Sequence, residues 1–405
     1  MSFAFVDDVL NERKKQGLLR TRKLVSSTRD GIITIDGKPC LNFASNDYLG
    51  LSQHPDVLQS YANGLAEFGA GSTASAVVCG HMQPHHDLES RLSELLNKPA
   101  ALLFNSGFCA NQALCQALFG QVSGSGISES KPTNHIVSDK LMHASFLEGA
   151  MHTNARLSRF HHNDISHLNA RLNACKDNVL VATEGVFSMD GDLGNIPSIQ
   201  QAIDERQRHA GSIQLLVDDA HALGVIGNNG LGSIEVDGVD ANDINILMAT
   251  FGKALGTAGA FIAGDKNLIE YLVNFAKHYV YSTAMPPAQA MATLTSLNIM
   301  LQGEQRTTLH ENIALFQALS KAKELEVMAS DTAIQPIIVG DDKACMWSSE
   351  KLMSLGIYVP GIRPPTVPKG KARLRVTLSA LHTPKDIHAL IDGLCIVRDE
   401  CWGGV

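Results

Sequence analysis

Short apolar runs alternate with amphipathic stretches along the middle of this chain. The runs predict strands at residues 100–104, 135–138, 179–183, 213–217, 244–248 and 259–263. Between most of them, apolar residues recur at the spacing of one helix face, as in residues 199–208. Strands that alternate with helices in this way favour a mainly parallel sheet covered on both faces, so we predict an α/β fold.

The pattern differs at both ends of the chain. Residues 1–30 look helical and basic, and residues 31–39 have the turn and apolar positions of a β-hairpin. Residues 281–287 interrupt the alternating pattern. They are followed by a long helical region, by strands at 333–339 and 373–378 and by a final amphipathic helix. We expect an N-terminal helix and hairpin at 1–45, a large domain at 46–287 and a smaller α/β domain at 288–405.

Composition narrows the class of protein. A hydrophobic content of 44% and a charged content of 18% are ordinary for a soluble globular chain. The net charge of −8 argues against a general nucleic-acid binder, whose affinity depends on neutralising phosphates. One basic cluster remains, and a solvated helix face is its favoured interpretation. The cluster consists of Arg13, Lys14, Lys15, Arg20, Arg22 and Lys23.

The sequence also predicts a location. No apolar stretch approaches the roughly 20 residues that a membrane helix needs. Asp7 and Asp8 break the apolar start at once, which is not typical of a secretory signal. The eight cysteines are scattered without a Cys-x-x-Cys pair, which favours idle thiols in a reducing compartment. We predict a cytoplasmic protein that has no membrane partner.

The sixteen histidines suggest that the protein could bind a metal ion. The candidate positions are His81, His85 and His86, and also His161 and His162. Adjacent histidines point in different directions on a helix or strand, and no carboxylate clearly completes a ligand set. We therefore expect no functional metal.

Chemistry-bearing residues follow four of the predicted strands. Asp218 ends one run, Glu184 follows another, and Lys253 lies on a glycine-rich turn after a third. Gly107 and Phe108 follow the fourth. Ligands of open α/β sheets bind beyond the carboxyl ends of the strands, so polar or glycine-rich segments at four strand ends indicate one site.

Lys253 and the segment Asp218-Asp-Ala-His221 suggest a Schiff-base cofactor. Pyridoxal phosphate needs an amine to hold its aldehyde and a carboxylate to keep its pyridine nitrogen protonated. Each residue alone has an ordinary alternative: Asp218 as a turn or N-cap acid, and Lys253 as a solvent-facing side chain. Together they favour the cofactor site.

A phosphate group would fit the turn after residue 104. The segment 105–111 leads into a helical stretch at 112–118, whose free N–H groups favour a bound anion. Thr250, three residues before Lys253, can add a hydroxyl to the same phosphate. An ordinary capped helix and a strand-end threonine are the alternatives.

The chain as a whole resembles the α-oxoamine synthases, pyridoxal-phosphate enzymes of fold type I. The resemblance rests on segments at 45–51, 105–108, 143–145, 183–192, 218–221, 250–253 and 281–283, in the same order. It implies a large cofactor-binding domain with a mainly parallel seven-stranded sheet, a smaller C-terminal α/β domain and a homodimer with its active site at the subunit interface. Ser282 or Thr283 would reach the phosphate from the second subunit.

The resemblance also assigns roles around the cofactor ring. Lys253 would hold the cofactor and later act as general base and acid, and Asp218 would pair with the pyridine nitrogen. His143 would stack on the ring, although a polar residue at a helix start is its ordinary alternative. His221 and Ser188 would contact the phenolic oxygen side.

Further roles fall on the phosphate and on the substrates. Gly107, Phe108 and Thr250 would hold the phosphate, while Glu184 and Asn46 would shape the substrate site. Arg363 is the expected partner of the substrate carboxylate, because a guanidinium matches a carboxylate in two hydrogen bonds. Arg20 and Thr366 are candidate contacts of the acyl substrate, with Arg22 and Lys23 as close rivals of Arg20.

Within the family, residues 282–287 and 362–368 are most similar to members that condense L-alanine with a pimeloyl thioester, carried on coenzyme A or on a carrier protein. Residues 71–80 depart from the family's glycine-rich loop, which leaves the acyl-chain preference open. The alternatives are a sister enzyme that uses glycine or serine, an aminotransferase, and a non-catalytic binder of the cofactor.

Overall fold

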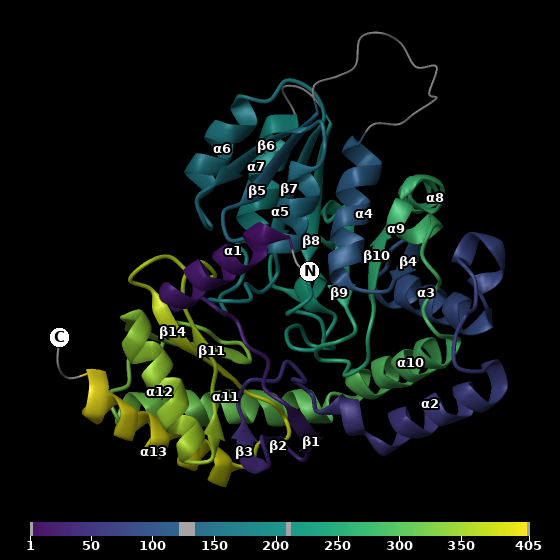
Figure 1. Cartoon of the computed structure of the whole chain (residues 1–405). Coiled ribbons are helices and arrows are strands. Elements are labelled where there is room, and N and C mark those ends of the chain that lie inside the picture. Colours follow the sequence, from purple (N-terminus) through teal and green to yellow (C-terminus); the bar gives the residue numbers. More distant parts are fainter. Residues whose placement is uncertain (1–2, 121–133, 208–211, 403–405) are drawn as a thin grey trace.

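A seven-stranded sheet forms the centre of the computed structural model, which describes residues 3–120, 134–207 and 212–402 (Figure 1). The strands lie in the order β4 (Ala100–Phe104), β10 (Ala260–Gly264), β9 (Ile246–Thr250), β8 (Ile213–Asp218), β7 (Val179–Glu184), β5 (His135–Asp139) and β6 (Arg156–Phe160). Strand β10 runs antiparallel to both of its neighbours, β4 and β9, and the other pairs of strands in this sheet are parallel. The predicted mainly parallel α/β fold is therefore confirmed.

Six of the seven strands match predicted runs, and the largest shift is at β9, which begins at Ile246 instead of residue 244. Strand β6 is not among the predictions. It lies at the edge of the sheet, and its residues are mostly polar and partly exposed. An edge strand need not be apolar on both faces, so its sequence lacks the continuous apolar run that marks a central strand.

Helices cover both faces of this sheet. Alternate residues of a strand point to opposite faces, so Leu180 and Ala182 join one core while Val179 and Val181 join the other. The first core includes residues of α4 (Gly107–Phe119), α5 (Ala144–Met151) and α8 (Lys266–Phe275). The second includes residues of α2 (Pro55–Phe68), α3 (Gln83–Leu95), α6 (Ile165–Asn173), α7 (Ile196–Gln207), α10 (Pro287–Gln302) and α11 (Glu304–Ala322).

A three-stranded antiparallel sheet forms the C-terminal part, in the order β11 (Ile334–Gly340), β14 (Ala372–Thr377) and β13 (Gly361–Ile362). Helices α12 (Asp342–Ser354) and α13 (Pro384–Cys401) accompany it, and α9 (Lys277–Val280) lies earlier in the chain. The apolar side chains of α13 at Ile387, Leu390, Ile391 and Leu394 are buried, as the amphipathic pattern indicates.

The N-terminal segment differs from its prediction. Helix α1 (Ala4–Lys15) ends well before residue 30, and Gly17 follows with a positive φ of 66°. Strands β1 (Val25–Arg29), β2 (Ile32–Ile35) and β3 (Lys38–Asn42) then pair in sequence. The turn at Asp36 and Gly37 has positive φ at both residues, which matches the twist of a hairpin.

Strand β3 also pairs in parallel with β12 (Ile357–Tyr358), so the N-terminal hairpin joins a segment from the C-terminal part of the chain.

The predicted domain boundaries stay a prediction. Among the described residues, the helices lack the combination of length and apolar character needed to cross a lipid bilayer.

His382 is buried where three segments meet, and its ring has a partner at each nitrogen. The Ser379 N–H donates to Nδ1 (3.1 Å), and Nε2 lies 3.0 Å from the Asn42 carbonyl oxygen. The carbonyl of His382 accepts from Asn312 of α11 (2.8 Å). Burial lowers the pKa of His382 to about 4, so the folded protein keeps the ring neutral.

We predict that His382 makes the protein less stable in acid. Its stabilising effect is complete above the ordinary histidine pKa of about 6.5 and is lost as the pH falls towards 4, by about 3 kcal/mol. Chemical denaturation of the His382→Gln variant should show a smaller loss of unfolding free energy between pH 7 and 4.5 than the unsubstituted protein. The exposed His388→Gln variant is the control, and an equal loss in all three proteins would contradict the prediction.

Candidate active site

The carboxyl ends of neighbouring strands bring the predicted residues together at one edge of the large sheet. Glu184 at the end of β7 lies opposite Asp218 at the end of β8 in the strand register. Thr250 ends β9, and Gly107 begins α4 just after β4. The approach of Gly107 and Thr250 is close: a Cβ atom at Gly107 would lie 2.5 Å from Thr250 Cγ2.

Asp218 is fixed by two hydrogen bonds. Its Oδ2 accepts from Asn111 Nδ2 (3.0 Å) and its Oδ1 from the Ala220 N–H (3.0 Å). Asn111 lies on α4 and also donates to the Ser145 hydroxyl on α5 (3.0 Å). That hydroxyl is 2.8 Å from His143 Nδ1, so a chain of polar contacts links Asp218 to His143.

His143 is the N-cap residue of α5, where its side chain accepts the Ser145 N–H. Partial desolvation lowers the pKa of His143, in opposition to the carboxylate of Asp218, and the amine of Lys253 lowers it further. The ring therefore favours the neutral form.

Lys253 lies on the turn between β9 and β10, partly buried among charged groups. Desolvation lowers its pKa to about 8, although the carboxylates of Asp218 and Glu184 favour the charged amine, and Arg375 adds to the lowering. Burial and the nearby Asp218 raise the pKa of Glu184 well above its ordinary value. An amine with a pKa near 8 is suited to nucleophilic and acid–base chemistry at neutral pH.

A second polar network lies around His221. Its Nδ1 is 2.6 Å from the Tyr48 hydroxyl, which is also 3.2 Å from Asn46 Oδ1. Burial, together with Lys253 and Arg375, lowers the pKa of His221 well below its ordinary value. Burial raises the pKa of Tyr48 to about 12. Both groups are therefore held neutral.

Arg375 belongs to the three-stranded sheet but reaches the edge of the large one. Its Nε donates to the Ser188 carbonyl oxygen (2.7 Å) and its Nη1 to Asn46 Oδ1 (3.3 Å). It is 6% exposed. Neither Arg375 nor Tyr48 is among the site residues predicted from the sequence. An arginine among apolar residues on a predicted strand was the available signal for Arg375, since a buried charge needs partners.

The remaining predicted residues lie farther out. Arg363 is partly buried, and its Nη1 donates to the Gly17 carbonyl oxygen of the N-terminal segment. Arg20 is exposed between α1 and β1, and Thr366 is exposed in the loop after Arg363. The structure gives no contact that joins Arg20 or Thr366 to Lys253 within its described residues.

Ser282 and Thr283 lie in the segment between α9 and α10. The Thr283 carbonyl oxygen accepts from Asn105 Nδ2 (2.9 Å), so this segment is adjacent to the turn that begins α4 in the same chain. Thr283 also forms an isolated bridge with Ser75. The Phe108 side chain on that turn is 44% exposed.

The donors present fit pyridoxal phosphate. The Thr250 hydroxyl is buried without a partner among the described residues, and the first turn of α4 begins beside it at Gly107. A hydroxyl and free N–H groups suit a phosphate. Lys253 and Asp218 supply the amine and the carboxylate that the aldehyde and the pyridine nitrogen require.

His161, Asp164 and His167 also lie close together, at the start of α6. Asp164 caps this helix through the His167 N–H (2.9 Å), and His167 Nδ1 accepts the His161 N–H (2.9 Å). These contacts account for the group as a helix cap, and we assign no metal to it.

Comparison with known proteins places the chain in a family. Residues 38–394 match the family model "Aminotransferase class I and II". The chain is 44% identical to the 8-amino-7-oxononanoate synthase of Pseudomonas entomophila over 97% of this chain and 96% of that protein. It is 43% identical to the protein of the same name from Stutzerimonas stutzeri, over 97% and 95%.

Solved structures share the fold. Serine palmitoyltransferase of Sphingomonas wittichii has a TM-score of 0.88 and 25% identity, with 99% of each chain covered. The 8-amino-7-oxononanoate synthase of Francisella tularensis has a TM-score of 0.73 and 30% identity, with 89% of this chain and 97% of that chain covered. The chain therefore belongs to the class I and II aminotransferase family and, within it, to the 8-amino-7-oxononanoate synthases.

Proposed function

We propose that this protein condenses L-alanine with a pimeloyl thioester and releases carbon dioxide and a free thiol. The product would be 8-amino-7-oxononanoate, for biotin biosynthesis. Identity of 44% to a protein of that name over nearly the whole chain is the observation that carries this proposal. The cytoplasmic location stays the prediction made from the sequence.

The proposed cofactor is pyridoxal phosphate, supported by the donor set around Lys253. When bound, it would withdraw electrons from the amino acid and so stabilise a carbanion at Cα. Gly107, Phe108 and Thr250 would hold its phosphate, with the α4 dipole favouring the negative charge. Asp218, itself fixed by Asn111, would hold the proton on the pyridine nitrogen.

Lys253 would carry the proton in this reaction. Its pKa of about 8 leaves part of the amine neutral at neutral pH, so it can accept the Cα proton of alanine and later return one. His143 would lie against the cofactor ring, in the orientation that its contact with Ser145 supports. Neutral His221 would hydrogen-bond the phenolic oxygen, with Ser188 nearby.

We assign the substrate contacts to residues at the centre of the site and to residues farther out. We propose that Glu184 and Asn46 shape the alanine site and that Arg363 binds the substrate carboxylate. Arg20 and Thr366 would contact the acyl chain. Arg363 donates to the Gly17 carbonyl oxygen, so the N-terminal segment that leads to Arg20 lies beside Arg363, which supports this assignment.

We also propose a homodimer, in which Ser282 or Thr283 reaches the phosphate of the other subunit. Exposed apolar side chains support this, because the segments that carry them adjoin at the Ser75–Thr283 bridge and the Asn105–Thr283 hydrogen bond. These side chains are Val78 (77% exposed), Phe108 (44%) and Tyr281 (82%).

Thiol release tests the function. The purified protein with pyridoxal phosphate should release thiol from pimeloyl-CoA with L-alanine, and at least about tenfold more slowly with glycine or L-serine. Pimeloyl carrier protein in a parallel assay identifies the preferred donor. Faster thiol release with glycine or serine would favour a sister enzyme, and pyruvate formation without thiol release would indicate an aminotransferase.

A second prediction concerns the amine of Lys253. Because its pKa is about 8, the apo protein should attach pyridoxal phosphate faster as the pH rises, with a midpoint near 8. At pH 7.5 such a lysine has more than about a hundredfold more neutral amine than an ordinary one. Asp218 favours the charged amine, so the midpoint should fall in Asp218→Asn.

Borohydride reduction followed by mass spectrometry measures this attachment. The mass of the cofactor should be absent from Lys253→Ala at every pH. A midpoint near the ordinary lysine value of about 10.4, or retention of the added mass in Lys253→Ala, would contradict the prediction.

A third prediction concerns the phosphate turn. In Gly107→Ala the new Cβ would overlap Thr250 Cγ2, so the turn must shift and the Kd for pyridoxal phosphate should rise about tenfold or more. Adding Thr250→Ser removes Cγ2 and keeps the hydroxyl, so the double variant should recover most of the affinity. Equilibrium titration of the apo proteins measures both, and a double variant as weak as Gly107→Ala would contradict the steric explanation.

A further inference from the structure

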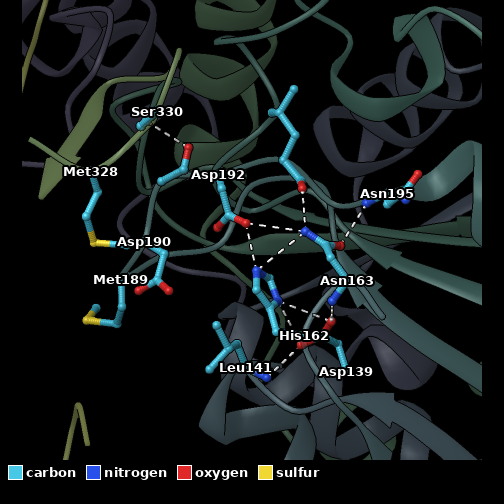
Figure 2. Close-up of polar contacts among 12 residues, drawn as sticks. Asp139, Leu141, His162, Asn163, Met189, Asp190, Asp192, Asn195, Met328 and Ser330 are labelled. Carbon is cyan, nitrogen blue, oxygen red and sulfur yellow. Dashed lines mark hydrogen bonds and ion pairs between the residues drawn. The ribbon is translucent and has the colours of Figure 1, made fainter. Parts of the chain in front are cut away.

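His162 lies between two carboxylates at the start of the β6–α6 connection (Figure 2). Its Nε2 is 2.7 Å from Asp192 Oδ2, and its Nδ1 is 3.2 Å from each oxygen of Asp139. The Asp139 side chain is fully buried, and that of His162 is 24% exposed. An imidazole with a carboxylate at both nitrogens can donate to both only when it carries a proton on each.

Asp139 controls the turn that leads to His143. It is the last residue of β5, and its Oδ1 accepts the Leu141 N–H (2.7 Å) while its Oδ2 accepts the Asn163 N–H (3.0 Å). The turn between Asp139 and His143 is therefore fixed to the β6–α6 connection through one buried carboxylate.

Asp192 belongs to the loop that follows Glu184. The loop closes on itself, because the Phe187 N–H donates to the Asp192 carbonyl oxygen (3.0 Å), and it carries Ser188. The His162 ring packs edge-on against Phe187, with 4.4 Å between the ring centroids. Asn163 adds a contact, since its Nδ2 donates to the Leu193 carbonyl oxygen (3.0 Å).

The same loop contacts the three-stranded sheet. Arg373 on β14 forms an ion pair with Asp190, and the Gly191 carbonyl oxygen accepts from the hydroxyls of Ser330 and Thr332 (2.9 Å each). Figure 2 shows Asp190 and Ser330 beside the His162 contacts. The loop after Glu184 therefore lies between His162 and the C-terminal part of the chain.

We propose that His162 is a positioning residue for the condensation: held as a cation between Asp139 and Asp192, it fixes the turn that carries His143 against the loop that carries Ser188. It does not touch the reacting atoms, and its effect on the reaction rests on the proposed function. His143 and Ser188 come from different strand ends, so their relative placement depends on a contact between the two segments.

The charges around the ring support a lasting cation. The titratable groups that face it are Asp139 from β5 and Asp192 from the loop. Asp190 is paired with Arg373, and Asp164 caps α6. Burial opposes the charge, but the two carboxylates outweigh it and raise the pKa of His162 to about 10. The ring thus stays protonated across the neutral range.

Substitution of His162 tests the positioning role. His162→Gln keeps one donor but loses the charge, and kcat for thiol release should fall about 10- to 100-fold, as expected when a reacting group is misplaced by about 1 Å. KM for L-alanine should change less than kcat. The visible circular dichroism of the bound cofactor should weaken, because it depends on the asymmetric placement of the groups around the ring.

His161→Gln is the matched control, since it removes a neighbouring exposed histidine and should leave kcat and the dichroism unchanged. The double variant of His162→Gln with Asp192→Asn should be no slower than the slower single variant, because both break the same link. Unchanged kcat in His162→Gln, or multiplying effects in the double variant, would overturn the proposal.

Nitrogen-15 NMR of the histidine rings tests the cation in the unsubstituted protein and needs no activity. The His162 signal should stay that of a doubly protonated ring at pH 8, and in Asp192→Asn the ring should lose its proton at a lower pH. A neutral ring at pH 8 would overturn the proposal even if His162→Gln does not fold. If the unsubstituted protein releases no thiol with alanine, the proposed function fails, whereas this measurement still decides the state of His162.

Discussion

A largely desolvated lysine amine beside two carboxylates is the interaction on which the candidate site depends. Parallel strand pairing determines the arrangement of these three residues. The register of β7 and β8 places Glu184 opposite Asp218, and the next strand leads to Lys253. Desolvation disfavours the ammonium form and outweighs the carboxylates, which favour it, so the pKa of the amine is lowered to about 8. Pairing of β7 with β8 fixes the backbone positions of Glu184 and Asp218, whereas Lys253 lies on the turn after β9.

Hydrogen bonds connect the polar groups around this amine into networks. Asn111, Ser145 and His143 form one chain of contacts from Asp218, and Tyr48 and Asn46 form another from His221. Buried polar groups without partners are costly, so a connected network fixes both the orientation and the protonation of each member. Neutral His143 and His221 next to a partly neutral Lys253 follow from this arrangement.

The C-terminal sheet contributes to the same site from the other side. Arg375 reaches Ser188 and Asn46, and Arg373 pairs with Asp190 on the loop after Glu184. Two arginines on one short strand thus contact the loop on which Ser188 lies. The placement of that loop depends both on the three-stranded sheet and on His162 on the opposite side.

Local sequence was sufficient for six of the seven strands of the large sheet, for the strand-end positions of Asp218, Glu184 and Lys253, and for the family. Periodicity and turn residues act over a few positions, so they predict elements and the edge where a ligand binds. The extent of α1, strand β6 and the parallel pairing of β3 with β12 needed the tertiary structure, since local polarity does not specify partners distant in the chain. The same holds for His162, for which the sequence offers no clear carboxylate partner. The fold supplies Asp139 and Asp192, from segments 23 and 30 residues away.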